Sequence, residues 1–174
     1  MKRTKRQHPA GFTLVEVIAT AAILATLTTS SFVLVRTASE AWRRHRNDSQ
    51  QRLQGVATLQ HIVRRVRQAS EVTAISSAAD VSGSITLLMP DGSSAIWDHV
   101  SGTNQILYGP VTPTNLLAAG ITELRFVGLK ADGTTATTTP ALIHSVQCTL
   151  KYSLVRPAGP TVETVSCTTW LRAW

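Results

Sequence analysis

A long apolar run follows the first eleven residues of the chain. Residues 12–35 (FTLVEVIATAAILATLTTSSFVLV) hold one ionisable side chain, that of Glu16. At about 1.5 Å of rise per residue, a helix over this run would be roughly 36 Å long. That length crosses a hydrocarbon core of about 30 Å with some tilt. The Thr and Ser residues between 26 and 31 reduce its hydrophobicity, but the pattern still predicts a helix that inserts into a membrane.

The segment after Arg36 becomes polar while keeping helical spacing. Apolar positions recur at three- and four-residue steps, and we expect them to form one buried stripe: Leu53, Val56, Leu59, Val63 and Val66, continued by Ser70. Their neighbours supply most of the polar side: Arg52, Gln60, Arg64, Arg65 and Arg67. No proline between Pro9 and Pro90 interrupts the pattern. We predict one helix from about residue 12 to about residue 70, apolar in its first half and amphipathic in its second.

Short β-type runs alternate with turn signals after residue 71. The expected strands are 84–89 (SITLLM), 94–100 (SAIWDHV), 105–109 (QILYG), 121–129 (ITELRFVGL), 144–155 (HSVQCTLKYSLV) and 161–174 (TVETVSCTTWLRAW). The Thr-rich stretch 134–140 is expected to be a loop. Consecutive strands joined by short turns predict an antiparallel sheet. The fold class is therefore α+β: the amphipathic helix half 36–70 packs on a sheet formed by 84–174.

The net charge of +7 is concentrated in the N-terminal part. Four of the seventeen Lys and Arg residues lie in the first six positions, and eight Arg lie between Arg36 and Arg67. Five basic and six acidic residues follow residue 71, so the predicted sheet region is nearly neutral. Any acidic partner should therefore be sought at the N-terminal part.

The junction Gly11-Phe12-Thr13-Leu14-Val15-Glu16 resembles the type IV prepilin signature. A basic leader ends in Gly, an aromatic residue follows, and Glu lies at the fifth position of the apolar helix that comes next. The resemblance implies that a prepilin peptidase removes leader 1–11 by cutting between Gly11 and Phe12. It also implies that a methylase modifies the new amino group of Phe12. The chain would then consist of a filament-core or transmembrane helix (12–35) and a pilin-like head (36–174).

Glu16 is costly in a bilayer unless a positive group lies beside it. Insertion scales give roughly 2.5–3.5 kcal/mol for a charge at the centre of a transmembrane helix. The resemblance implies a partner, namely the Phe12 amino group of a neighbouring subunit, and a role for Glu16 in setting the register of assembly. A polar residue that only lies near the membrane edge is the alternative interpretation.

Two other kinds of N-terminal segment share some of these features. A secretory signal peptide also combines a basic start with an apolar run, but its run is shorter, and it ends in a small-residue cleavage site. A plain membrane anchor explains the length but neither Gly11-Phe12 nor Glu16. Under the prepilin interpretation the protein is a single-pass inner-membrane protein with a cytoplasmic N-terminus and a periplasmic head, and it assembles into a periplasmic or extracellular filament.

The later sequence resembles a particular branch of this family. The segments Leu53–Ala69 and Gly120–Phe126 are similar to minor pilins and to the J-type minor pseudopilin of type II secretion. Residues 12–35 also lack the helix-bending proline usual in major pilins. The resemblance implies a minor structural subunit that starts assembly at the filament tip. The alternative is a binding subunit at a tip, for DNA uptake or adhesion. The nearly neutral head favours assembly, and nucleic acid is not an expected partner.

The two cysteines are placed symmetrically about the last predicted turn. Cys148 and Cys167 have their midpoint at 157.5, within one residue of the centre, 158.5, of the loop Pro157–Pro160. They should therefore lie opposite each other on adjacent antiparallel strands. In the oxidising periplasm that the resemblance implies, we expect a disulfide between them. Two buried free thiols are the alternative.

A basic cluster with one aromatic residue follows the apolar run. Trp42, Arg43, Arg44 and Arg46 would suit lipid head groups or nucleic-acid phosphates. A solvated helix face just outside the bilayer is the simpler interpretation, and lipid contact comes next.

The sequence contains no constellation typical of an enzyme. The acidic residues after position 90 are isolated from one another, whereas calcium sites cluster several oxygen ligands. The histidines show no metal-ligand spacing with the cysteines. We expect no catalytic activity, no cofactor and no metal.

Overall fold

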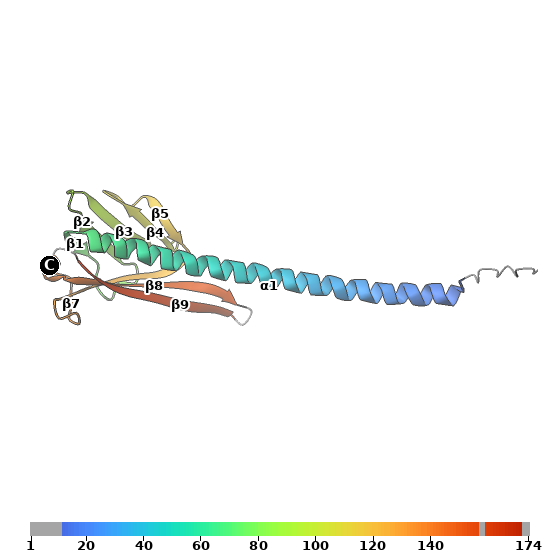
Figure 1. Cartoon of the computed structure of the whole chain (residues 1–174). Coiled ribbons are helices and arrows are strands. Elements are labelled where there is room, and N and C mark those ends of the chain that lie inside the picture. Colours follow the sequence, from blue (N-terminus) through green and yellow to red (C-terminus); the bar gives the residue numbers. More distant parts are fainter. Residues whose placement is uncertain (1–11, 157–158, 172–174) are drawn as a thin grey trace, which may run out of the picture. The chain divides into compact units, whose positions relative to one another are not determined.

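The computed structural model describes residues 12–156 and 159–171. The helix α1 (Leu14–Gln68) is followed by nine described strands and a short 3-10 helix, η1 (Pro140–Leu142). Figure 1 labels α1 and most of the strands. The chain divides into two compact units, residues 1–45 and 46–174, which are described separately below. From here on, the head means this second unit, 46–174, which begins ten residues after the start of the predicted head, 36–174.

In the first unit the described residues belong almost entirely to α1, and their apolar side chains are exposed. Examples are Phe12 (82 % exposed) and Leu34 (70 % exposed). An 18-residue window of α1 near the N-terminus reaches a mean hydropathy of 1.9, and none of it is buried within the chain. The helix is therefore long and apolar enough to cross a membrane, and its apolar surface needs a covering from outside the chain.

The Thr and Ser residues of the apolar run bond to the backbone of their own helix. Thr26 Oγ1 donates to the Ile23 carbonyl at 2.8 Å, and Thr29 Oγ1 donates to the Ala25 carbonyl at 2.8 Å. Thr28 and Ser30 make the same kind of bond one turn back. Because these hydroxyl groups have their donors satisfied internally, their cost in an apolar environment is reduced.

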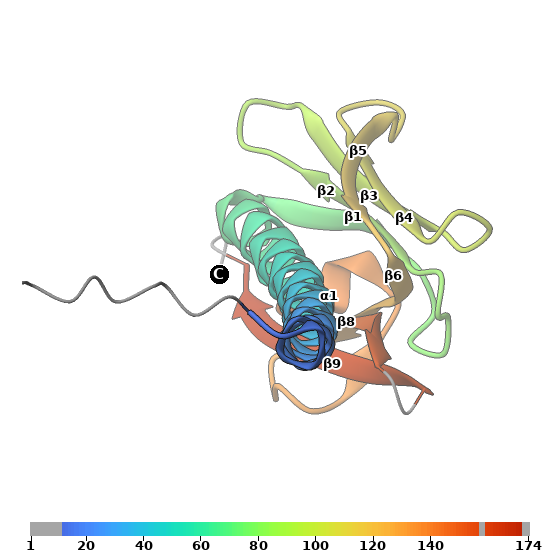
Figure 2. The same ribbon diagram turned by 90° about the vertical axis from the view of Figure 1, so that its right-hand side faces the viewer.

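The head contains two antiparallel sheets. The first has the strand order β1-β2-β3-β4-β5, with β1 (Glu71–Ile75), β2 (Ser84–Leu88), β3 (Ser94–Val100), β4 (Gln105–Gly109) and β5 (Asn115–Ala119). The second has the order β7-β6-β8-β9, with β6 (Ile121–Leu129), β7 (Ala136–Thr137), β8 (Ser145–Arg156) and β9 (Gly159–Trp170). The second half of α1 packs against both sheets (Figure 2). The α+β prediction is confirmed, with two sheets in place of the expected one.

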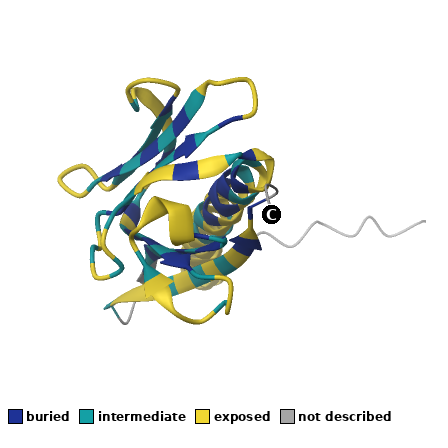
Figure 3. Ribbon diagram, turned by 90° about the vertical axis from the view of Figure 1, so that its left-hand side faces the viewer, coloured by how far each residue is buried: buried dark blue, intermediate teal, exposed yellow. Residues whose placement is uncertain are grey.

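Alternating burial along the strands places one face of each sheet in a common core. β3 alternates strictly between half-buried and buried residues, and its Trp97 is fully buried. The dark blue bands in Figure 3 show the same alternation in other strands and a buried face on α1. Trp97 Nε1 donates to His61 Nδ1 at 3.4 Å, which ties the first sheet to the helix.

The buried face of α1 differs from the predicted stripe. Leu59 and Val66 are buried as expected, but Leu53 is 70 % exposed and Val56 is 40 % exposed. Val63 is only half-buried. Three residues outside the predicted stripe are buried instead: Gly55, Thr58 and Ile62. The helix is therefore rotated relative to the face that hydrophobicity alone selects.

Gly55 explains this rotation. A Cβ atom at this position would lie 3.0 Å from Tyr152 Cε1, which is tighter than an ordinary van der Waals contact. The small residue lets α1 approach β8 closely, and this approach fixes which side of the helix faces the sheet.

Ion pairs fix the β8–β9 hairpin to the helix. Arg52 pairs with Glu163 of β9, and Arg156 pairs with Asp48 of α1 at 3.1 Å. Tyr152 Oη also donates to Glu163 Oε2 at 3.1 Å. The hydrogen bond from Arg52 lowers the pKa of the Glu163 carboxyl. The Arg52–Glu163 pair therefore stabilises the folded head at pH values above the ordinary pKa of Glu. This stabilisation is lost as the pH falls through the lowered pKa of Glu163.

Candidate functional site

The N-terminus of α1 is built around Thr13, which lies directly after Phe12. The backbone N–H of Glu16 donates to the Thr13 carbonyl at 3.1 Å and to Thr13 Oγ1 at 3.3 Å. The N–H of Val17 donates to the same carbonyl at 3.2 Å. Thr13 is therefore the N-cap of the helix, and Thr13-Leu14-Val15-Glu16 has the spacing of a capping box. The apolar pattern does not predict this role for Thr13, whereas a Thr followed three residues later by Glu is a sequence signal for it.

Glu16 lies in the first turn of α1 and is exposed, among exposed apolar side chains. Its carboxylate receives no hydrogen bond or ion pair from any described residue. A negative charge in the first helical turn is favoured by the helix dipole. The carboxylate is thus oriented by a capped helix end and is available to a cation outside the described residues. Gly11 and the rest of the leader 1–11 lie outside the described residues, so the predicted cleavage junction is described only on its Phe12 side.

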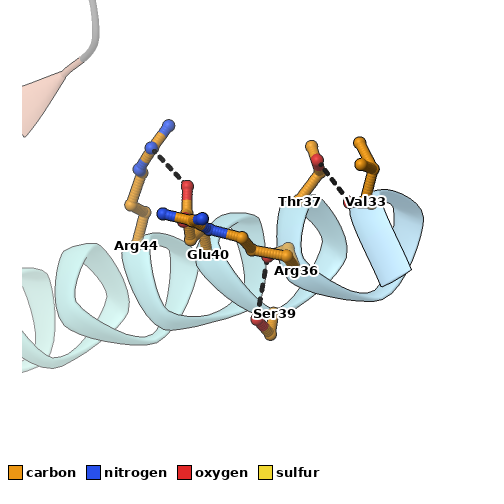
Figure 4. A network of polar contacts seen from close by, with 6 residues as sticks. All are labelled: Val33, Arg36, Thr37, Ser39, Glu40 and Arg44. Atoms are coloured by element: carbon orange, nitrogen blue, oxygen red, sulfur yellow. Dashed lines mark hydrogen bonds and ion pairs between the residues drawn. The ribbon is translucent and has the colours of Figure 1, made fainter. Parts of the chain in front are cut away.

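One arginine of the predicted basic cluster, Arg44, has an acidic neighbour on the same helix. Glu40 accepts a hydrogen bond from Arg36 Nε at 3.1 Å and pairs with Arg44 at 3.6 Å (Figure 4). These i,i+4 pairs partly neutralise Arg44. Trp42 is 73 % exposed, and Arg43 is exposed with no ion pair to a described residue. Arg46 belongs to the head, where its side chain is also exposed.

The two cysteines lie where the turn symmetry predicts. Cys148 of β8 is the register partner of Cys167 of β9, in a hairpin paired without a shift from Ser145–Trp170 to Arg156–Gly159. Both are free thiols in this structure, so the disulfide stays a prediction. Burial raises the pKa of the Cys148 thiol, and the neighbouring Cys167 adds to the effect. Cys167 is the more accessible of the two.

No group of three or more His, Cys, Asp or Glu side chains that could hold a metal ion is found in the part of the chain that the structure describes. His99 is buried, and its Nε2 lies 2.8 Å from the Ile121 carbonyl oxygen, which gives it a structural role at the start of β6.

Comparison with protein families matches residues 6–32 to the Prokaryotic N-terminal methylation motif. The matched segment contains Gly11, Phe12, the Thr13 cap and Glu16. No curated protein and no solved structure gives a significant match to the chain. The matched residues therefore include the capped start of α1 described above. Proteins that carry this motif have a structural role.

Proposed function

Because the chain is a type IV pilin-like protein, we propose that it is a minor subunit of a type IV pilus-like filament or of a type II secretion pseudopilus, acting when assembly starts at the tip. The observation that carries the proposal is the ordered junction from Gly11 to Glu16 at the capped start of an exposed apolar helix. A structural filament subunit needs such a helix, because neighbouring subunits can cover the apolar side chains that the chain itself leaves bare.

The minor role is supported by two features of the sequence. Residues 12–35 contain no proline, and α1 is assigned as one helix from Leu14 to Gln68. The segments Leu53–Ala69 and Gly120–Phe126 resemble minor pilins and the J-type minor pseudopilin. The nearly neutral region after residue 71 supports assembly over binding of DNA or a surface.

The proposed location follows from the same motif. Before assembly, residues 12–35 cross the inner membrane, the leader 1–11 is cytoplasmic and the head is periplasmic. We propose that four exposed residues contact lipid head groups: Trp42, Arg43, Arg44 and Arg46. The partners would be a prepilin peptidase and methylase, followed by other pilin or pseudopilin subunits.

Leader removal tests the proposal most directly. When the full chain is co-expressed in membranes with an active prepilin peptidase, we expect a cut between Gly11 and Phe12 and a methylated Phe12 amino group. N-terminal mass spectrometry of the purified protein measures both. An inactive peptidase is the control and should leave the leader in place. An intact leader beside the active enzyme, or a cut at another bond, would contradict the proposal.

A periplasmic head also leads to a prediction for the cysteines. We expect a Cys148–Cys167 disulfide in protein taken from the periplasmic side of the membrane, since the register partners already lie on adjacent strands. The accessible Cys167 is the thiol that reacts first, because burial disfavours the thiolate of Cys148. On the chain-entropy model the bond would add about 3 kcal/mol to the free energy of unfolding.

Thiol alkylation under denaturing, non-reducing conditions measures this bond. No alkylated cysteine is expected before reduction and two are expected after it. The Cys167→Ser variant serves as the control, with one thiol alkylated in both states. Recovery of two alkylated cysteines without reduction would show that the thiols stay free.

A further inference from the structure

A groove runs between the last turns of α1 and the end of β9. Its volume is about 900 Å³, and it lies entirely within the head. One wall is a single face of α1, formed by residues at three- and four-residue steps: Gln60, Val63, Arg64 and Arg67, with Gln68 beside them. The other wall is the segment Thr168–Leu171.

This second wall is the free edge of a sheet. β9 is the outermost strand of the order β7-β6-β8-β9, so one row of its backbone N–H and C=O groups has no strand partner among the described residues. Thr169 and Leu171 are buried towards the core, whereas Thr168 and Trp170 are exposed on the opposite side of the strand. Since side chains of both faces line the groove, the groove follows the backbone edge. An unprotected edge of this kind is a template for another strand.

The groove carries positive charge that no described acidic residue neutralises. The head arginines Arg52, Arg125 and Arg156 all form ion pairs with carboxylates. Arg64 and Arg67 form none with the described residues, and Arg67 Nε donates instead to Thr169 Oγ1 at 3.2 Å. The nearby His61 is affected by this charge: burial is the main cause of its lowered pKa, and Arg65 and Arg64 lower it further.

We propose that this groove binds an extended, acidic segment of a partner protein, which adds to β9 as a further strand. Main-chain hydrogen bonds to the β9 edge would hold the segment, and its carboxylates would pair with Arg64 and Arg67. Trp170, which is 57 % exposed, offers an apolar contact to side chains on the opposite face of the added strand. The inference concerns the head alone and is independent of whether the chain enters a filament.

Charge also decides against two occupants from this chain itself. The leader contains Lys2, Arg3, Lys5 and Arg6 and no acidic residue, so it would be repelled. In a second copy that paired its β9 with this β9, Arg64 and Arg67 of both copies would lie near the same edge. No carboxylate would be added to neutralise these arginines, so the two copies would repel each other. A partner segment with Glu or Asp at alternate positions meets both the charge and the strand geometry.

The test uses the full chain in detergent and a short fluorescein-labelled peptide of alternating Glu and Val as the probe. Fluorescence anisotropy measures binding, and hydrogen exchange measures protection of the β9 amides. We expect saturable binding with slower exchange in the second half of β9. The double variant Arg64→Gln/Arg67→Gln should weaken binding about tenfold or more. The matched variant Arg43→Gln/Arg46→Gln removes the same charge at the same helical spacing and should leave binding unchanged.

Two control peptides separate strand addition from simple charge attraction. A peptide with Lys in place of Glu should not bind. A peptide that keeps every Glu but has Pro in place of Val should bind at least tenfold more weakly, because proline cannot donate to a ladder. Equal binding of the proline peptide, equal loss in both double variants, or no binding of the Glu–Val peptide would overturn the proposal. Displacement by duplex DNA at an equal concentration of negative charge would also overturn it in favour of a nucleic-acid site.

Discussion

Replacing Ile62 with Asp is expected to unfold the head, whereas the same change at the adjacent Val63 should leave it folded. Ile62 is 1 % exposed and belongs to the hydrophobic core between α1 and the sheets. A carboxylate there would be buried without a partner, which costs more than about 4 kcal/mol. Val63 lines the open groove beside Arg64, so an Asp there would remain solvated and would cost about 1 kcal/mol or less.

Thermal unfolding of the full chain, followed by near-ultraviolet circular dichroism, measures both changes. The fully buried Trp97 makes this signal sensitive to the packing of the head. Ile62→Val is the conservative control and should lower stability by about 1 kcal/mol. If Val63→Asp lowered the melting temperature as much as Ile62→Asp, the helix would face the sheets with the stripe that hydrophobicity predicts.

Replacing Glu16 with Ala is expected to leave leader cleavage intact and to reduce incorporation into filaments about tenfold or more. The proposed cleavage junction is at Gly11, whereas Glu16 lies on the capped first turn of α1, where no described residue bonds to its carboxylate. In an apolar environment an unpaired carboxylate costs roughly 2.5–3.5 kcal/mol, so pairing with the amino group of a neighbouring subunit would favour the assembled state. Alanine removes that pairing and leaves the apolar helix surface in place.

The measurement compares the amount of processed subunit in the membrane with the amount that co-purifies with other pilin subunits. Glu40→Ala removes a carboxylate from the same helix, whose ion pairs with described residues are those to Arg36 and Arg44, and should assemble normally. Wild-type incorporation of Glu16→Ala would show that the carboxylate has no part in register. A loss of cleavage in this variant would instead assign Glu16 to recognition by the peptidase.

Local pattern was sufficient to predict most of the strands of the head. The predicted runs 94–100, 105–109 and 121–129 coincide with β3, β4 and β6. All three runs are bounded by turn residues, and β3 also alternates strictly in burial, as does the middle of β6; these signals are local to the segment. The register of β8 and β9 was also predictable, because an unshifted hairpin pairs residues symmetrically about its turn.

Three strands, β1, β5 and β7, and the division into two sheets were not predictable in this way. β5 (NLLAA) is rich in Leu and Ala, which favour helices, and becomes a strand through pairing with β4. β1 begins three residues after α1 ends and pairs with β2. The change of sheet occurs at Gly120, whose φ of 76° turns the chain between β5 and β6. The Thr-rich stretch predicted as a loop contains β7 and the start of η1.

Signals between neighbouring residues were enough to identify the N-terminal segment of this protein and most of the strands of the head. The junction Gly11–Glu16 is recognised from the order of adjacent residues, and the apolar run is recognised from its composition. Neither depends on contacts with distant parts of the chain. Only the tertiary structure decided which face of α1 is buried and which lines the groove. The close approach at Gly55 and the position of β9 at the sheet edge set that choice, and both depend on residues about a hundred positions apart, such as Arg67 and Thr169 (separation 102). Hydrophobic periodicity reflects only neighbouring residues and cannot include contacts between distant ones. It therefore predicted that Leu53 is buried and gave no indication that Arg64 and Arg67 line a groove.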